Sequence, residues 1–234
     1  MDYFTLDYAI IFIPDFTLSI IDNRLSNTTE IKVKMTESNE ATDKPIPMTD
    51  EQIQASNVGV PAILNQPVLI VDYDPEWPKR FEREAARIRA ALGSAALTIE
   101  HVGSTSVPGL AAKPKIDILL VVANSADEST YVTALEEAGY VLKIREPDWY
   151  EHRMLKGPDT DVNLHVFSQG CEEIERMLLF RNWLRNNADD RQLYEQTKRA
   201  LATQSWKYMQ NYADAKTTVV AEILARARKA ATSE

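Results

Sequence analysis

The sequence is poor in the residues that build disulfide frameworks, zinc sites and membrane spans. Its 234 residues include one cysteine, Cys171, which excludes an internal disulfide bond and a zinc site made of cysteines alone. No long basic tract points to a nucleic-acid partner. The first 25 residues are apolar, but Asp2, Asp7 and Asp15 interrupt them and no basic segment precedes them. We therefore expect a cytoplasmic protein with neither a signal peptide nor a membrane span.

Charge and polarity divide the chain into two parts. Residues 1–60 hold ten Asp and Glu against four Lys and Arg, and so carry −6 of the net charge of −9. From about residue 22 to residue 66 the sequence is polar and aperiodic, which is typical of a segment that buries too little apolar surface to offset the entropy of ordering it. We expect a poorly structured N-terminal extension over residues 1–66 and a folded domain over residues 67–231.

Hydrophobic periodicity in the second part predicts strands and helices in mixed order, followed by helices alone. The predicted strands cover residues 67–73, 96–102, 115–122, 140–144, 150–155 and 162–167. The predicted helices cover residues 76–93, 126–138, 172–187, 189–204 and 212–230. A mixed β-sheet packed with helices and followed by a C-terminal helical cap is an α+β fold.

The segment HVGSTSVPGLAAKPKIDI, residues 101–118, joins two predicted strands. Gly103 follows the first strand, where a glycine lets backbone N–H groups approach an anion while the hydroxyls of Ser104 and Thr105 donate to it. Asp117 lies on the next strand, where a carboxylate can hold Mg²⁺ or Mn²⁺ against phosphate oxygens. A Gly-Ser turn, a spacer and an acid on the neighbouring strand are the layout of a nucleotidyltransferase palm.

Several motifs carry a resemblance to a known family. IEHVGSTSVPGLAAKPKIDILLVV, together with EHRMLKGPDTDVNLHVF, FRNWLR, YEQTKR and QNYADAK, resembles the GrpB family from about residue 68 to residue 227. The resemblance implies a minimal nucleotidyltransferase-like domain, which in some bacteria is appended to dephospho-coenzyme A kinase. It implies no particular reaction.

The sequence lacks two of the acidic residues that active nucleotidyltransferases have. Such enzymes usually present two acids separated by one residue, and a third acid on a nearby strand, because two metal ions need bridging carboxylates. Here Lys115 and Leu119 share the strand face of Asp117, and Asn163 and His165 lie where a third acid is expected. We therefore expect a phosphate ligand that binds with one metal ion or with none.

All three histidines, His101, His152 and His165, fall on predicted strands within these motifs. A neutral imidazole binds a transition metal or acts as a general acid or base. We assign candidate catalytic roles to His101 and His165 together with Asp117, and a candidate ligand-binding role to His152. The alternative is that each histidine hydrogen-bonds within the sheet and fixes the loops.

Cations and tyrosines complete the candidate site. Tyr194 and Tyr212 each precede a lysine, Lys198 or Lys216, by four residues, which places each pair on one helix face. There a ring can pack against a base while the ammonium group meets phosphate; the alternative is an ordinary helix surface on which a lysine snorkels over a tyrosine. The other candidate ligand-binding cations are Lys113, Arg153 and Arg181.

Two classes of function fit this sequence. One is an enzyme of nucleotidyl or phosphoryl transfer, in which Gly103 and Ser104 cradle phosphate and Asp117 holds a metal ion. The other is a non-catalytic module that kept the phosphate cradle and lost the acids, linked to coenzyme A metabolism by analogy with the fused bacterial proteins. Both predict a nucleotide or another phosphate-bearing small molecule as the partner, rather than nucleic acid or a membrane.

Overall fold

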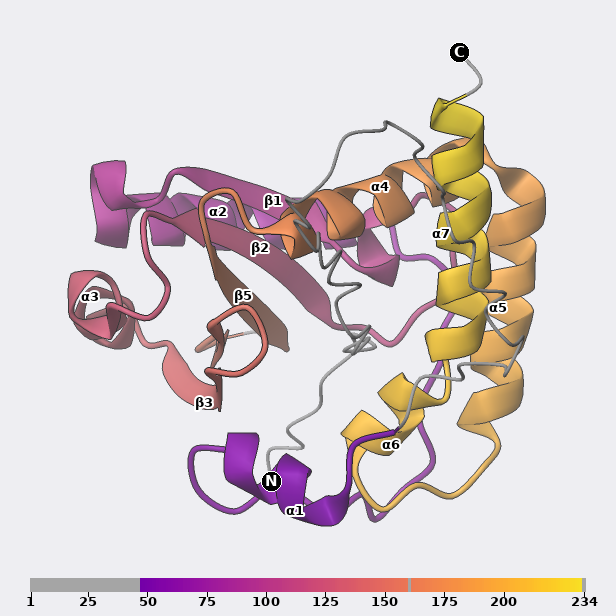
Figure 1. The fold of residues 1–234 in the computed structure, drawn as a ribbon, viewed down its shortest axis with the longest axis horizontal. Helices are drawn as coiled ribbons and strands as arrows, with labels where there is room; N and C mark the ends of the chain where they lie inside the picture. The colour runs from indigo at the N-terminus through magenta and orange to yellow at the C-terminus, as the bar shows by residue number, and fades with distance from the viewer. Residues whose placement is uncertain (1–46, 160, 233–234) are drawn as a thin grey trace, which may run out of the picture.

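The computed structural model describes residues 47–159 and 161–232, which form a five-stranded mixed sheet flanked by helices (Figure 1). The strands are β1 (Thr98–Val102), β2 (Ile116–Val122), β3 (Val141–Glu146), β4 (His152–Lys156) and β5 (Val162–Ser168). Their order across the sheet is β1-β2-β5-β4-β3. Strands β2 and β5 run parallel, and the other neighbours run antiparallel. The fold is therefore α+β, as the sequence predicts.

The helices fall before, within and after the sheet. They are α1 (Asp50–Ser56), α2 (Trp77–Leu92), α3 (Val132–Glu137), α4 (Glu172–Asn186), α5 (Ala188–Ala202), α6 (Met209–Asp214) and α7 (Thr217–Ala231). Short 3-10 turns cover η1 (Gly93–Ala95), η2 (Ser104–Ser106) and η3 (Glu128–Thr130). Helices α4–α7 form the helical cap, and Figure 1 shows α5 and α7 side by side at one end of the sheet. Within the described ranges, no helix is both long enough and apolar enough to cross a membrane.

The two faces of the sheet bury different side chains. On β2, Ile116, Ile118 and Leu120 join the main apolar core together with α2 and α3. Leu119 packs on the opposite face, in a second cluster that includes Met177 of α4. Because side chains alternate along a strand, Asp117 also points to this second side, which we call the cap face.

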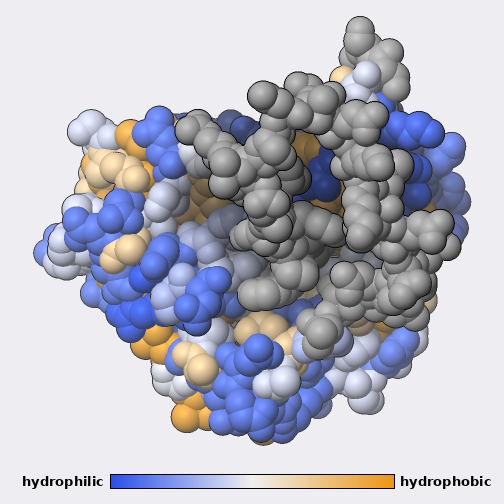
Figure 2. Space-filling model, in the orientation of Figure 1, coloured by the Kyte–Doolittle hydropathy of each residue, from blue (hydrophilic) through white to orange (hydrophobic). Residues whose placement is uncertain are grey.

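The outer surface of the cap is hydrophilic along the edge that α5 and α7 form in Figure 1, as Figure 2 shows. On α5, for example, Arg199 is exposed while its neighbour Lys198 is buried. The amphipathic pattern of α5 therefore turns one lysine inward, toward the sheet.

Helix α1 corrects the expectation that the chain is poorly structured up to residue 66. Thr49 and Gln52 form a capping box at its start, and Ile53 is buried. After the helix, the backbone N–H of Val58 donates to the carbonyl of Lys143 at 2.8 Å. This polar segment therefore folds because Ile53 packs against the rest of the domain and β3 supplies a backbone hydrogen bond. Residues 1–46 of the predicted extension lie outside the described residues.

Three further predictions differ from the structure in detail. Residues 67–73 make one isolated bridge, Val71 with Ala112, instead of a strand. The helix predicted over residues 126–138 begins only at Val132, because the Thr130 hydroxyl bonds to the carbonyl of Asp127 and competes with helical bonding. The helix predicted over residues 212–230 is broken between α6 and α7, just before four successive β-branched residues at 217–220.

Candidate functional site

The turn after β1 is shaped by an acid on β2. Gly103 has a φ of 71°, a conformation that other residues rarely adopt. A β-carbon at this position would lie 2.5 Å from Oδ2 of Asp117, so only glycine fits against this carboxylate. The turn continues into η2, where the Ser106 hydroxyl donates to the Gly103 carbonyl at 2.6 Å, and Arg185 of α4 donates to the Ser106 carbonyl at 2.8 Å. The turn and the acid predicted from the sequence thus meet in the structure.

From Asp117, one branch of polar side chains runs across β5 to β4. The side-chain amide of Asn163 donates to Oδ1 of Asp117 at 2.8 Å, and Nζ of Lys156 donates to Oδ1 of Asn163 at 2.6 Å. Burial holds the pKa of Lys156 well below its usual range, and the charges of Lys115 and Lys113 lower it further. Lys113 and Lys115 therefore lie close enough to Lys156 for their charges to act on it.

A second branch runs through two histidines to an acid at the end of β3. Nε2 of His165 lies 3.7 Å from Oδ1 of Asp117, and its Nδ1 lies 3.0 Å from Nε2 of His152. Nδ1 of His152 lies 2.6 Å from Oε2 of Glu146. All four side chains are buried. Burial raises the pKa of Glu146 to about 7 and holds the pKa of His152 well below its usual range.

Lysines from three segments converge around Tyr212 and the loop before β2. The ammonium groups of Lys113 and Lys216 lie 5.9 Å and 4.8 Å from the centre of the Tyr212 ring. Lys198 donates to the carbonyl of Ala111 in the same loop, and the Tyr212 hydroxyl reaches the carbonyl of Lys198 at 3.5 Å. The ammonium group of Lys198 lies 4.8 Å from the centre of the Tyr194 ring, so each predicted pair of a tyrosine and a lysine is in contact. The fold brings these two lysines to the loop that contains Lys113, and we call Lys113, Lys198 and Lys216 the inner lysines. The ring of Tyr212 is fully buried, so it supports ammonium groups rather than offering an open stacking surface.

His101 does not join the other two histidines. Its ring stacks on Phe81 at 4.8 Å, and its Nε2 lies 3.0 Å from the hydroxyl of Thr105. Burial lowers the pKa of His101 to about 3, and the charges of Arg185 and Arg181 add to the effect. The neutral ring of His101 binds Thr105, and the two residues together anchor the start of the loop. His101 and Thr105 therefore do not join Asp117 in the candidate site.

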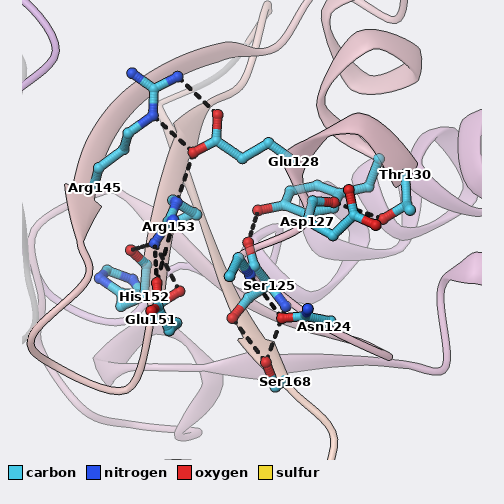
Figure 3. Close-up of polar contacts among 12 residues, drawn as sticks. Asn124, Ser125, Asp127, Glu128, Thr130, Arg145, Glu151, His152, Arg153 and Ser168 are labelled. Carbon is cyan, nitrogen blue, oxygen red and sulfur yellow. Dashed lines mark hydrogen bonds and ion pairs between the residues drawn. The ribbon is translucent and has the colours of Figure 1, made fainter.

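Arg153 lies on the other face of the sheet, as Figure 3 shows. Its Nε donates to Glu128 at 2.7 Å, and Arg145 binds the same carboxylate through two nitrogens. The hydrogen bonds from Arg145 and Arg153 lower the pKa of Glu128 to about 2. The neighbour of His152 in sequence is therefore a structural cation, because adjacent strand residues point to opposite faces.

Arg181 lies near the turn but is engaged there. Its guanidinium donates to Oε2 of Glu100 at 2.6 Å and to the carbonyl of His101 at 2.9 Å. It lines a hollow under the cap that also contains Gly103, Ser104, Arg176 and Tyr194. Arg181 therefore stands at the rim of the predicted phosphate cradle rather than among the inner lysines.

The residues present do not fit a two-metal centre. Leu119 occupies the position of the second acid and packs against apolar neighbours on β1, β5 and α4. Asp117 accepts a hydrogen bond from Asn163 and abuts Gly103. Within residues 47–159 and 161–232, no group of three or more His, Cys, Asp or Glu side chains is arranged to hold a metal ion. A single Mg²⁺ or Mn²⁺ held between Asp117 and a phosphate stays a prediction.

Three titratable residues of this region were not predicted from the sequence. Lys156 could have been found, because it shares a strand face with His152. Glu146 follows the predicted strand and reaches His152 only after a register shift between Leu142 and Ile144. Asp214 of α6 accepts from the Met48 backbone at 2.9 Å, and burial raises its pKa to about 6. No local pattern marks the last two.

These features define an α+β domain with a helical cap and a glycine turn that clasps a strand carboxylate. Among known protein families, the one described as "GrpB protein" matches residues 67–226 of this chain. The chain therefore belongs to the GrpB family, which includes proteins named UPF0157. The family predicted from the sequence motifs is confirmed.

Relatives support this assignment over most of the domain. The UPF0157 protein BH1888 of Halalkalibacterium halodurans is 61% identical over 181 residues, which cover 77% of this chain and 93% of that protein. The crystal structure of the conserved protein GrpB from Enterococcus faecalis matches with a TM-score of 0.61 and 32% identity, over 69% of this chain and 98% of that one. A dephospho-CoA kinase of Mycolicibacterium paratuberculosis is 31% identical over 62% of this chain and 42% of its own length.

Proposed function

We propose that this protein binds a phosphate-bearing small molecule of the nucleotide class between the Gly103 turn and the inner lysines. The observation that carries the proposal is the gathering of three ammonium groups at the loop before β2: Lys113 lies in this loop and shares the Tyr212 ring with Lys216, and Lys198 donates to the Ala111 carbonyl of the same loop. Each of these lysines is buried. An anion with several charges is the natural partner for cations gathered in this way.

Energetics argue against a purely structural role for these lysines. Burying an ammonium group is costly, and replacing a buried ion pair by apolar side chains often leaves a protein as stable or makes it more stable. The charges of Lys113 and Lys115 both act on Lys156, and Asp161 supplies one carboxylate for Lys115 and Lys156. A polyphosphate would offset their mutual repulsion, which is the physical reason to expect one there.

Calorimetric titration with pyrophosphate, ATP and coenzyme A tests the proposal. Lys198→Met and Lys216→Met each remove a cation while keeping the length of the side chain. A hydrogen bond to a charged group is worth about 1.5–3 kcal/mol, so each variant should bind about ten- to a hundredfold more weakly. Lys79→Met is the matched control, because Lys79 is exposed on α2 and pairs with Glu76.

Thermal unfolding of the same variants separates binding from folding. Each variant also loses a contact within the fold, the hydrogen bond of Lys198 to the Ala111 carbonyl or the packing of Lys216 on the Tyr212 ring, so we expect a moderate fall in melting temperature with the protein still folded. Wild-type protein that binds none of the three ligands would contradict the proposal. So would lysine variants that lose stability but keep wild-type affinity, since the lysines would then be structural.

A specific observation favours a binding module over a transferase. Leu119 replaces the acid that a two-metal enzyme needs, and its packing is apolar. The pair of His165 and Asp117 favours an enzyme, because an imidazole beside a carboxylate can move a proton. Incubating the protein with ATP and Mg²⁺, and separating the products by ion-exchange chromatography, distinguishes the two. Release of pyrophosphate or ADP above the rate of a Lys198→Met control would establish transfer or hydrolysis.

A further inference from the structure

Three buried side chains form a continuous row that ends beside Asp117. Glu146 ends β3, His152 begins β4, and His165 lies on β5. The two contacts that join them measure 2.6 Å and 3.0 Å, both within hydrogen-bonding distance. We infer that Glu146, His152 and His165 form a proton relay that delivers or removes a proton at the Asp117 end of the cap face.

The hydrogen bonds make the protonation of Glu146, His152 and His165 interdependent. When Glu146 is ionised, it accepts from Nδ1–H of His152, whose bare Nε2 then accepts from Nδ1–H of His165. The Nε2 of His165 is then without a proton and can accept one. When Glu146 carries a proton, every bond in the row reverses, and Nε2–H of His165 points its proton toward Asp117, 3.7 Å away. The charge on one acid thus sets the tautomer of two histidines.

The middle ring of the row, His152, stays neutral. Burial holds the pKa of His152 well below its usual range, and neighbouring positive charge lowers it further, which disfavours an imidazolium ion at His152. Burial raises the pKa of Glu146 to about 7, so this carboxyl group changes its charge near neutral pH. A proton therefore passes His152 by an exchange of tautomers, without a positive charge on that ring.

Charged groups from the neighbouring elements also face Glu146. One of them is Asp214 of α6. Burial raises the pKa of Asp214 to about 6, and the charge of Glu146 raises it further. Lys216, at the start of α7, acts on Asp214 in the opposite direction. On the sheet itself, His165 on β5 lowers the pKa of Glu146, and His152 on β4 bonds to it directly. Asp214 therefore lies within electrostatic reach of both Glu146 and Lys216.

Each proton that one group of the row releases is accepted by the next group. A hydroxyl group of a bound phosphate ester, or a water molecule, gives its proton to Nε2 of His165. The Nδ1 proton of His165 passes to Nε2 of His152, and the Nδ1 proton of His152 passes to the Glu146 carboxylate. The hydroxyl group becomes an alkoxide or hydroxide, Glu146 becomes neutral, and both rings end neutral. The identity of the hydroxyl donor rests on the proposed function, whereas the relay does not.

Nitrogen-15 NMR of histidine-labelled full-length protein tests the relay without any ligand. The chain has three histidines, so three pairs of ring nitrogens are to be assigned. Between about pH 5.5 and about pH 8.5, we expect His152 and His165 to exchange tautomers together, with one midpoint near the Glu146 pKa. His101 should keep its tautomer, because it bonds to Thr105 in a separate environment.

Glu146→Gln is the decisive variant. An amide does not titrate, so the exchange of tautomers should disappear while His101 is unchanged. Glu137→Gln, which makes the same charge change at an exposed position of α3, should leave the exchange as in the wild type. Tautomers of His152 and His165 that do not change over this pH range in the wild type, or that still exchange in Glu146→Gln, would overturn the relay.

Adding pyrophosphate separates this inference from the proposed function. If the tautomer exchange is present but pyrophosphate, ATP and coenzyme A do not bind, the relay stands and the proposed ligand class fails. If the ligands bind but no exchange occurs, the proposed function stands and the relay fails. Chemical denaturation of Glu146→Gln checks that the variant is folded, and His152→Gln offers a second break in the row should it not be.

Discussion

The carboxylate of Asp117 occupies the space that a β-carbon on Gly103 would need. The two would approach to 2.5 Å, and Gly103 also has a positive φ. The phosphate-turn glycine and the strand acid are therefore one structural unit: the turn keeps its shape only while residue 103 has no side chain.

The first prediction separates this contact from backbone strain. Gly103→Ala should destabilise the protein by the cost of the conformation and of the clash with Asp117. Gly109→Ala is the matched control, because Gly109 also has a positive φ but open space around its α-carbon. We expect the control to lose about 1 kcal/mol and Gly103→Ala to lose about 1–3 kcal/mol more, measured by urea unfolding. Equal losses in the two variants would mean that Asp117 yields to the new methyl group.

The second prediction concerns a metal ion at Asp117. Asp117→Asn keeps the shape of the side chain and removes its charge. We expect Mg²⁺ to strengthen ATP binding in the wild type, and this increment to vanish in Asp117→Asn, because one carboxylate and phosphate oxygens are a usual set of Mg²⁺ ligands. Calorimetric titration of both proteins, with Mg²⁺ and with chelator, measures it. If wild-type affinity is the same with metal and with chelator, Asp117 serves the turn and the relay and holds no ion.

The third prediction uses the pKa of Lys156. Because the folded pKa is held well below the value of about 10.5 in the unfolded chain, the unfolded state binds more protons between these two values. Stability should therefore rise with pH across that window and should be lowest where Lys156 is protonated in both states. Lys156→Met should flatten this slope, whereas Lys79→Met, at an exposed position, should not. Guanidinium unfolding from about pH 6 to about pH 10 measures both slopes, and an unchanged slope in Lys156→Met would show that another group controls it.

The fourth prediction tests whether α1 belongs to the folded unit. Ile53 is buried where α1 meets β3 and α6, in the region that also contains Tyr208 and Met209. Ile53→Ala should cost about 2 kcal/mol, which is a fall of roughly 5 °C in melting temperature for a chain of this size. Gln54→Ala, at the next and exposed position, should leave the melting temperature within about 1 °C. An unchanged melting temperature in Ile53→Ala would mean that α1 adds nothing to the stability of the folded domain.

Local features of the site could be predicted because they depend on neighbours in sequence. The glycine turn and the acid follow from a strand, a loop and a strand with alternating faces, which place Gly103 and Asp117 at the same end of β1 and β2. Helical spacing on α5 puts Tyr194 next to Lys198, and their 4.8 Å contact follows from that spacing. Motifs of this length were also enough to indicate the family.

Tertiary structure alone decided which side chains meet across the sheet. Arg153 and His152 are adjacent in sequence, yet one binds Glu128 on one face and the other joins the histidine row on the opposite face. Glu146 reaches His152 because β3 changes register on β4, and His165 reaches Asp117 because β5 pairs in parallel with β2 across a gap of more than 40 residues. Periodicity fixes the face on which a side chain points. The strand order and the bulge, which arise from packing of the whole sheet against its helices, fix which side chain lies opposite.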